Sequence, residues 1–167
     1  MRTLYLLRHA KSSWDDPTLP DDRRPLAPRG RRDGKRIAEH LRRHEIEPEL
    51  VLCSFAARTR ETLELVRPAL GGAAVVVEDK LYGASADRLL ARIRLVPDEV
   101  ESVMVIGHNP GLHELALSLA STGDELERLE EKFPTGALAT LASAEPWGRV
   151  APGSATLTAY VVPKQLG

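Results

Sequence analysis

Short apolar runs alternate with amphipathic stretches along most of this 167-residue chain, and this alternation limits its fold more than any other feature. Residues 3–8 and 102–107 are almost entirely apolar and have the length of a strand. Strands of this kind are buried on both faces, as in the parallel sheets of α/β proteins. Strands that alternate with helices predict a right-handed, mainly parallel sheet with helices on both faces.

The remaining elements follow from the same patterns. Four more apolar runs predict strands, at residues 50–53, 73–77, 136–142 and 155–162. Four periodic stretches predict helices, at residues 28–44, after Ser54, at residues 86–95 and after Asn109.

Local signals refine these elements. Ser54 and Asn109 are expected to cap the helices that follow them. In the helix after Asn109, Pro110 is expected at the first position and Gly123 beyond the end. The last two strands are expected to be antiparallel, and residues 10–28, with four prolines, are expected to form a long ordered loop. We therefore predict one three-layer α/β/α domain over residues 1–167.

Composition excludes several classes of function. Hydrophobic residues make up 43% of the chain and the formal net charge is −1, so no overall attraction to nucleic acid or to a membrane is expected. No stretch approaches the roughly 20 apolar residues of a membrane span. The single cysteine, Cys53, cannot form an intramolecular disulfide, which suits a reducing compartment. We expect a cytoplasmic protein with no nucleic-acid or membrane partner.

Charged side chains gather where three of the predicted strands end. Arg8 and His9 end the first strand, Arg58 lies in the first helical turn after the second strand, and His108 follows residues 102–107. Ligands of α/β sheets bind outside the carboxyl ends of the strands, so these four side chains are expected to meet. Arginine offers planar donor forks that match phosphate oxygens, and helix N-termini favour anions.

The two histidines add chemistry to this anion site. A nearby cation disfavours imidazolium, so both rings are expected to be neutral, and neutral imidazole is the nucleophilic form. One histidine can then attack phosphorus while the other donates to the oxygens that gain charge. Arginine and histidine side chains without a carboxylate cluster offer no natural cage for Mg²⁺, so no metal and no cofactor are expected.

Four ordered blocks of sequence resemble the histidine phosphatase superfamily, the phosphoglycerate-mutase-like proteins. Leu6-Leu7-Arg8-His9-Ala10-Lys11-Ser12-Ser13-Trp14 resembles the R-H-G-x-[ST]-x-[WY] signature, and Leu26-Ala27-Pro28-Arg29-Gly30 resembles L-T-x-x-G. Residues 54–62 resemble S-x-x-x-R-[AT]-x-x-T, and Ile106-Gly107-His108-Asn109 resembles the segment with the second histidine. Residues 21–26, 107–111 and 133–136 are most similar to the small SixA-type phosphohistidine phosphatases.

This resemblance implies a role for each matching residue. His9 is the implied phosphoaccepting nucleophile, Arg8, Arg58 and His108 are the implied phosphate pocket, and Ser12 takes the signature's Ser/Thr position. Asp21, in a D-x-x-R-P-L pattern of the close relatives, is a candidate proton donor, although a loop or cap role competes with it.

Three departures from the wider family are visible. Ala10 replaces the commoner glycine, and Asp15 stands where mutase-type relatives often have asparagine, so Asp15 is expected to turn outward. Larger relatives insert a cap between the third and fourth strands that often carries a glutamate acid. Here only about 25 residues separate these strands. Glu78 and Asp79 lie in this region, but neither belongs to a clear acid motif. We expect no cap domain and a shallow open site, and the proton donor stays open.

Other reactive side chains have simpler interpretations. His40 and His44 lie four apart on one helix but lack a third metal ligand, and His113 fits a structural role. Cys53 is one residue too close to Arg58 for the C-x5-R loop of cysteine phosphatases, and Arg60 competes with Arg58 for the phosphate role. The arginines of residues 29–43 are expected to form a solvated face that attracts anionic substrates.

The expected function is a metal-independent phosphatase that forms phosphohistidine on His9 and acts on phosphohistidine in proteins. Two alternatives stay open. One is a small-molecule phosphomonoesterase acting on sugar phosphates or nucleotides, and the other is a phosphate-binding signalling module without turnover. The sequence leaves the partner protein and the oligomeric state open.

Overall fold

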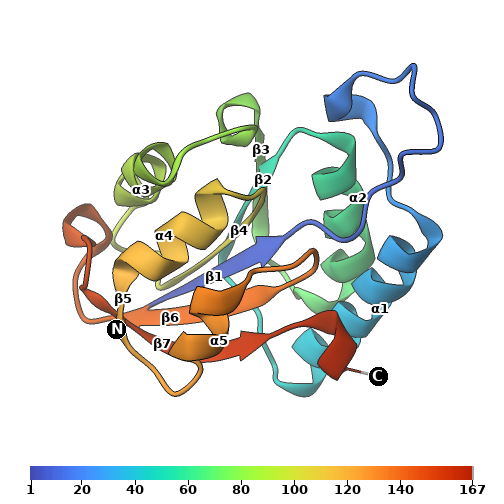
Figure 1. Cartoon of the computed structure of the whole chain (residues 1–167). Coiled ribbons are helices and arrows are strands. Elements are labelled where there is room, and N and C mark those ends of the chain that lie inside the picture. The colour runs from blue at the N-terminus through green and yellow to red at the C-terminus, as the bar shows by residue number, and fades with distance from the viewer. Residues whose placement is uncertain (167) are drawn as a thin grey trace.

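A computed structural model describes residues 1–166 of the chain and contains one seven-stranded sheet with the order β3-β2-β4-β1-β6-β7-β5 (Figure 1). The strands are β1 (Arg2–Arg8), β2 (Leu50–Ser54), β3 (Ala74–Glu78), β4 (Ser102–Gly107), β5 (Ala120–Thr122), β6 (Leu138–Ser143) and β7 (Ala155–Val161). β1 to β4 are mutually parallel, β6 is antiparallel to both its neighbours, and β7 therefore runs in the direction of β1. The predicted mainly parallel sheet with an antiparallel C-terminal strand is confirmed.

Helices cover both faces of the sheet. They are α1 (Pro28–Arg43), α2 (Ala57–Val66), α3 (Ala86–Arg94), α4 (Gly111–Leu119) and α5 (Leu126–Glu131). α1 and α2 pack on one face and α3, α4 and α5 on the other, which gives the predicted three layers (Figure 1). Within residues 1–166, no helix has the length and hydropathy needed to span a bilayer.

The buried strands supply side chains to both layers in turn. In β1, Leu4 and Leu6 pack toward α3 and α4, while Leu7 packs toward α1 and α2. In β4, Val105 and Ile106 divide between the two layers in the same way. Successive side chains of a strand point to opposite faces, so a nearly continuous apolar run fits a strand buried on both sides.

Both predicted helix caps are wrong. The N-cap of α2 is Ala56, without a side-chain hydrogen bond, and the N-cap of α4 is Pro110, so α4 begins one residue later than expected. Ser54 and Asn109 have other partners, His108 Nε2 and the carbonyl of Phe133. Both side chains have the local preference of a helix cap, but they form hydrogen bonds with residues distant in the sequence instead.

The segment after α4 differs most from the prediction. α4 ends at Leu119, and residues 120–122 form β5, which pairs with β7 at the edge of the sheet. Gly123 follows this strand instead of ending the helix, and α5 was not predicted. By contrast, the connection between β3 and β4 holds only a short 3₁₀ turn (Asp79–Leu81) and α3, so the predicted lack of a cap domain is confirmed.

Candidate active site

The sheet register brings the two expected histidines together. β1 and β4 are parallel neighbours with Arg8 opposite Gly107, so His9 and His108 leave adjacent strands at the same level. Their ring centroids lie 5.4 Å apart with planes tilted by 53°. Both residues are buried: His9 is 6% exposed and His108 is 9% exposed. The predicted convergence at the carboxyl ends of the strands is present.

The hydrogen bonds of His9 determine which ring nitrogen is available. Nδ1 lies 2.7 Å from the carbonyl oxygen of Ala10, and a carbonyl can only accept, so Nδ1 carries the proton. Nε2 then holds the lone pair. The backbone is held as well, because His9 N–H donates to Gly107 and Gly136 N–H donates to His9. Burial lowers the pKa of His9 to about 3, with smaller contributions from His108 and the two arginines. The ring is neutral at neutral pH.

His108 is held from two sides. Its Nε2 lies 2.8 Å from Ser54 Oγ, and the Tyr82 ring meets it edge-on with centroids 5.4 Å apart. Burial, followed by the charge of Arg58, lowers the pKa of His108 to about 4. The sequence predicted neutral histidines because of nearby cations, but burial is the larger cause for both rings.

The two arginines approach from different elements. Arg8 is the last residue of β1, and its Nη1 donates to the carbonyl of Phe133 at 3.2 Å. Arg58, in the first turn of α2, is 7% exposed. The buried Nε atoms of both arginines and Nδ1 of His108 have no hydrogen-bond partner within residues 1–166. Buried polar atoms without partners are costly, so the cluster as it stands has donors left over for a ligand.

Asp21 is bound to Arg58 instead of being free to transfer a proton. Arg58 donates to the backbone carbonyl of Asp21 at 2.7 Å and to its carboxylate at 3.0 Å, and Arg24 donates to the other carboxylate oxygen at 3.1 Å. Tyr82 Oη donates to Oδ2 at 2.5 Å. The hydrogen bond from Tyr82 is the largest cause that lowers the pKa of Asp21 to about 2. A carboxyl group with this pKa carries no proton at neutral pH, so this geometry favours the competing loop role of Asp21, and proton donation by Asp21 stays a prediction.

Ser12 lies in the loop beside the cluster and is buried. Its hydroxyl oxygen accepts a hydrogen bond from Arg24 at 2.8 Å, and the Arg24 guanidinium stacks on the Trp14 ring at 3.5 Å. Ser12 keeps its own proton as a donor, so its predicted phosphate contact stays a prediction.

Sequence reasoning missed three residues of this site. Arg24 belongs to the D-x-x-R-P-L segment, and that segment was the available signal for a role. Ser54 stands where the sequence predicts a helix cap, so its hydrogen bond to His108 has no sequence signal. Tyr82 lies in the turn after Asp79–Leu81, where no motif marks it, and only the fold brings it to Asp21 and His108.

The competing side chains lie elsewhere or are engaged. Arg60 is exposed and donates to the carbonyl of Phe55, so the structure selects Arg58 over Arg60. Burial raises the pKa of Cys53 to about 12, which makes it a poor nucleophile. His113 Nε2 bonds the carbonyl of Leu129, a structural role as predicted. Asp15 is exposed, as expected.

Within residues 1–166, the two histidines at the C-terminal end of α1 do not form part of a metal site. His40 and His44 lie side by side with ring centroids 4.4 Å apart. Within the described part of the chain, no group of three or more His, Cys, Asp or Glu side chains could hold a metal ion.

Comparisons with known proteins identify the family of the chain. The family model of the histidine phosphatase superfamily (branch 1) matches residues 4–88. An uncharacterised protein of Mycobacterium tuberculosis (strain H37Rv) is 40% identical over 162 residues, which cover 95% of this chain and 100% of the relative.

Two solved structures extend the match to the whole fold. A protein from Nakamurella multipartitia, provisionally assigned as the phosphohistidine phosphatase SixA, superposes with a TM-score of 0.84 at 32% identity and covers 97% of this chain and 96% of its own. The protein histidine phosphatase SixA complexed with tungstate superposes with a TM-score of 0.81 at 26% identity, covering 99% of both chains. The chain is a SixA-type member of the histidine phosphatase superfamily, with the activity class of a phosphatase.

Proposed function

We propose that this phosphatase removes phosphoryl groups from phosphohistidine on proteins through a phosphohistidine intermediate on His9. The observation that carries the proposal is the hydrogen bond from His9 Nδ1 to the carbonyl of Ala10, because it leaves the lone pair of Nε2 free. The neutral ring lies beside two arginines and a second neutral histidine. A neutral imidazole among cationic donors suits attack on a phosphoryl group.

In the first step, Nε2 of His9 forms a bond to phosphorus while the bond to the leaving group breaks. Arg8 and Arg58 hold the phosphoryl oxygens, and their planar forks neutralise the charge that develops there. Ser54 Oγ accepts a hydrogen bond from Ala56 N–H, so its hydroxyl group can donate a hydrogen bond to Nε2 of His108. His108, as a neutral ring, then carries its single N–H proton on Nδ1, which has no partner within residues 1–166 and can donate to a phosphoryl oxygen.

In the second step, water attacks phosphorus and the bond to His9 Nε2 breaks. Inorganic phosphate leaves, the proton of the water passes to solvent, and His9 returns to its neutral form. Positive side chains supply the charge neutralisation in both steps, so the proposed reaction requires no divalent metal.

The choice of substrate follows from the carboxyl groups near the site. Asp21 is ionised and bound to Arg58, and Glu78 is paired with Arg92 at 2.8 Å. A placed general acid contributes about 10²–10⁴-fold when an alkoxide must leave. A phosphohistidine ring that is protonated on its other nitrogen leaves as neutral imidazole, whose conjugate acid has an unperturbed pKa of about 6.5, so the bond to phosphorus breaks without a placed acid. A site without a placed acid therefore favours phosphohistidine over alkyl phosphates.

Access to the site points in the same direction. The short connection of residues 79–101 forms no cap over the strand ends. A histidine on a folded protein is bulky around its phosphoryl group, and an uncapped site can admit it. The substrate partner is then a phosphorylated protein, and we keep the prediction of a cytoplasmic location.

The test compares kcat/KM for a phosphohistidine peptide, an aryl phosphate, a sugar phosphate and a nucleoside monophosphate. We expect efficiency to fall from phosphohistidine through the aryl ester to the alkyl esters. Equal efficiency on the sugar phosphate and the peptide would favour the small-molecule phosphatase. Binding of phosphate without turnover of any substrate would favour the signalling module.

A further inference from the structure

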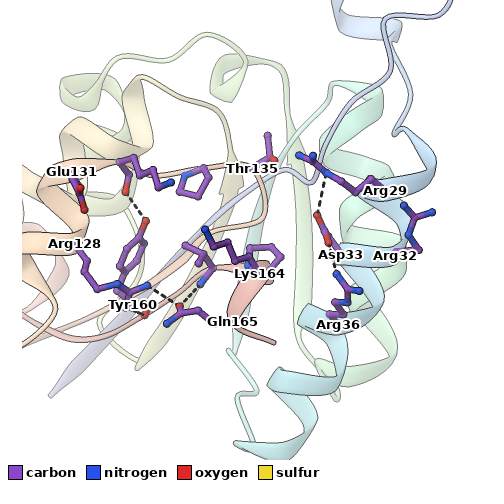
Figure 2. A pocket seen from close by; sticks show the side chains of 14 residues that line it. Arg29, Arg32, Asp33, Arg36, Arg128, Glu131, Thr135, Tyr160, Lys164 and Gln165 are labelled. Carbon is purple, nitrogen blue, oxygen red and sulfur yellow. Dashed lines mark hydrogen bonds and ion pairs between the residues drawn. The ribbon is translucent and has the colours of Figure 1, made fainter. Parts of the chain in front are cut away.

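A pocket of about 700 Å³ opens beside the candidate active site, between α1 and the C-terminal segment (Figure 2). One wall is the arginine-bearing face of α1, and the other is formed by residues 131–135, the end of β7 and the turn that follows it. Two of the lining side chains are carboxylates, Asp33 and Glu131. Six are cationic: Arg29, Arg32, Arg36, Arg128, Lys132 and Lys164.

Each wall of the pocket has one end beside the segment that contains His9. Thr135 precedes Gly136, whose N–H donates to the carbonyls of Arg8 and His9 at 3.1 and 2.9 Å. Arg29 precedes Gly30, where α1 packs so closely that a Cβ atom would lie 2.1 Å from the Lys11 carbonyl oxygen. Figure 2 shows Thr135 and Arg29 facing each other at the same end of the pocket. This end therefore lies next to His9.

The pocket extends away from His9 along the same edge of the sheet. β7 runs in the direction of β1 and lies two strands from it, beyond β6. Neighbouring strands are roughly 4.8 Å apart, so the end of β7 lies about 10 Å from the end of β1. A phosphoryl group on His9 would not reach that far, but the flank of a large substrate would.

The positive charge of the pocket is only partly neutralised. Asp33 is buried between Arg36, at 3.2 Å, and Arg29, at 4.0 Å, so one carboxylate faces two guanidinium groups. Arg32 and Lys164 are exposed, and within residues 1–166 neither has an ion-pair or hydrogen-bond partner for its side-chain charge. The pocket thus presents a concentrated positive field to an approaching molecule.

We propose that this pocket docks acidic side chains that flank the phosphohistidine of a protein substrate. The inference rests on the proposed function and adds to it a rule for choosing among phosphoproteins. Extended chain advances about 3.3 Å per residue, so an acidic residue three or more positions from the phosphohistidine spans the distance from His9 to the pocket. Complementary charge raises association rates and selects partners, so the effect belongs in kcat/KM.

The experiment uses two synthetic phosphohistidine peptides that differ only in their flanks. One carries glutamate and the other lysine at positions three to six residues on either side of the phosphohistidine. We expect the wild-type protein to prefer the glutamate peptide by about 10-fold in kcat/KM at low ionic strength. The preference should shrink as sodium chloride is raised to about 1 M, where the Debye length falls to about 3 Å.

Two matched double variants test whether the preference for the glutamate peptide arises in the pocket. Arg32→Glu combined with Lys164→Glu reverses two charges in the pocket, and the glutamate-over-lysine preference should fall to about 1 or below. Arg67→Glu combined with Arg149→Glu makes the same change of net charge at exposed positions outside the pocket, and should keep the wild-type preference. Circular dichroism establishes that both variants fold, and the salt series on the wild-type protein tests the pocket without any variant.

The outcomes separate this inference from the proposed function. If the wild-type protein hydrolyses neither peptide, both fail. If it hydrolyses both peptides equally, or if the control variant loses the preference as much as the pocket variant, only the docking inference fails. If the pocket variant lowers kcat/KM for a nucleoside monophosphate as much as for the glutamate peptide, the pocket serves small anions and the inference is overturned.

Discussion

Arg58 and Asp21 are joined by two hydrogen bonds, one from the guanidinium to the Asp21 carbonyl at 2.7 Å and one to its carboxylate at 3.0 Å. The same carboxylate accepts hydrogen bonds from Arg24 and Tyr82. This network fixes the direction in which Arg58 presents its remaining N–H groups. In the proposed phosphate pocket, we therefore expect Asp21 to act through Arg58 as a positioning residue.

Asp21→Asn is expected to lower kcat/KM for phosphohistidine and for an alkyl phosphate by the same factor, about 10-fold. The change weakens a charge-assisted hydrogen bond to Arg58, and such bonds are worth roughly 1.5–3 kcal/mol. A proton donor would behave differently, because its loss would harm the alkyl ester far more. Asp22→Asn, at a neighbouring carboxylate, serves as the matched control and should leave both values near wild type. A selective loss on the alkyl ester would restore the donor role.

Tyr82→Phe should lower kcat/KM several-fold while keeping the ring edge against His108. It removes the hydrogen bond that most lowers the pKa of Asp21, so the carboxylate holds Arg58 less firmly. The double variant with Asp21→Asn should be little worse than Asp21→Asn alone, because residues of one network are not additive. Tyr5→Phe, which removes a hydroxyl group from β1, is the control. Effects that simply multiply would show that Tyr82 acts independently of Asp21.

The rings of His9 and His108 should not titrate between about pH 5.5 and 8, because burial holds both in the neutral form. Their pKa values of about 3 and about 4 lie below the unfolded value of 6.5. The unfolded chain therefore binds more protons than the folded protein between those values. Stability that is present above 6.5 is lost as the pH falls toward 4.

Nuclear magnetic resonance of the two rings, assigned with His9→Ala and His108→Ala, measures this directly. Free imidazole in the same sample serves as the reference. A midpoint near 6.5 for either ring would contradict the assignment of buried neutral histidines.

Activity should survive removal of divalent cations. After treatment with EDTA, turnover of an aryl phosphate is expected to stay at its untreated value, because arginine and histidine neutralise the phosphoryl oxygens in the proposed mechanism. A metal-dependent phosphatase carried through the same treatment must lose its activity. Loss of turnover that Mg²⁺ or Zn²⁺ restores would show that the cationic pocket is insufficient.

The elements that hold the site were predictable because their patterns are long and regular. Residues 3–8 and 102–107 are apolar runs of strand length, and as adjacent parallel strands they bring Arg8, His9 and His108 to one edge of the sheet. β5 and α5 were missed because a three-residue strand and a six-residue helix are too short for a periodic signal.

The details of the site depend on contacts between distant segments. Ser54 and Asn109 have the side chains of helix caps, yet His108 and Phe133 take their hydrogen bonds. Asp21 shows a carboxyl group in the sequence, but whether it donates a proton or binds a cation depends on Arg58 and Tyr82, 37 and 61 residues away. Burial, which the sequence gives only coarsely, decides the protonation of both histidines.

The central claim is that His9 carries the phosphoryl group during turnover. Rapid quenching in alkali with ³²P-labelled substrate, followed by peptide mapping, measures it most directly, because phosphohistidine survives alkali and decays in acid. We predict label on the peptide that contains His9, absent in His9→Ala and retained in His113→Ala, a histidine outside the site. Label on a serine, on Cys53 or on His108 in the wild-type protein would contradict the account.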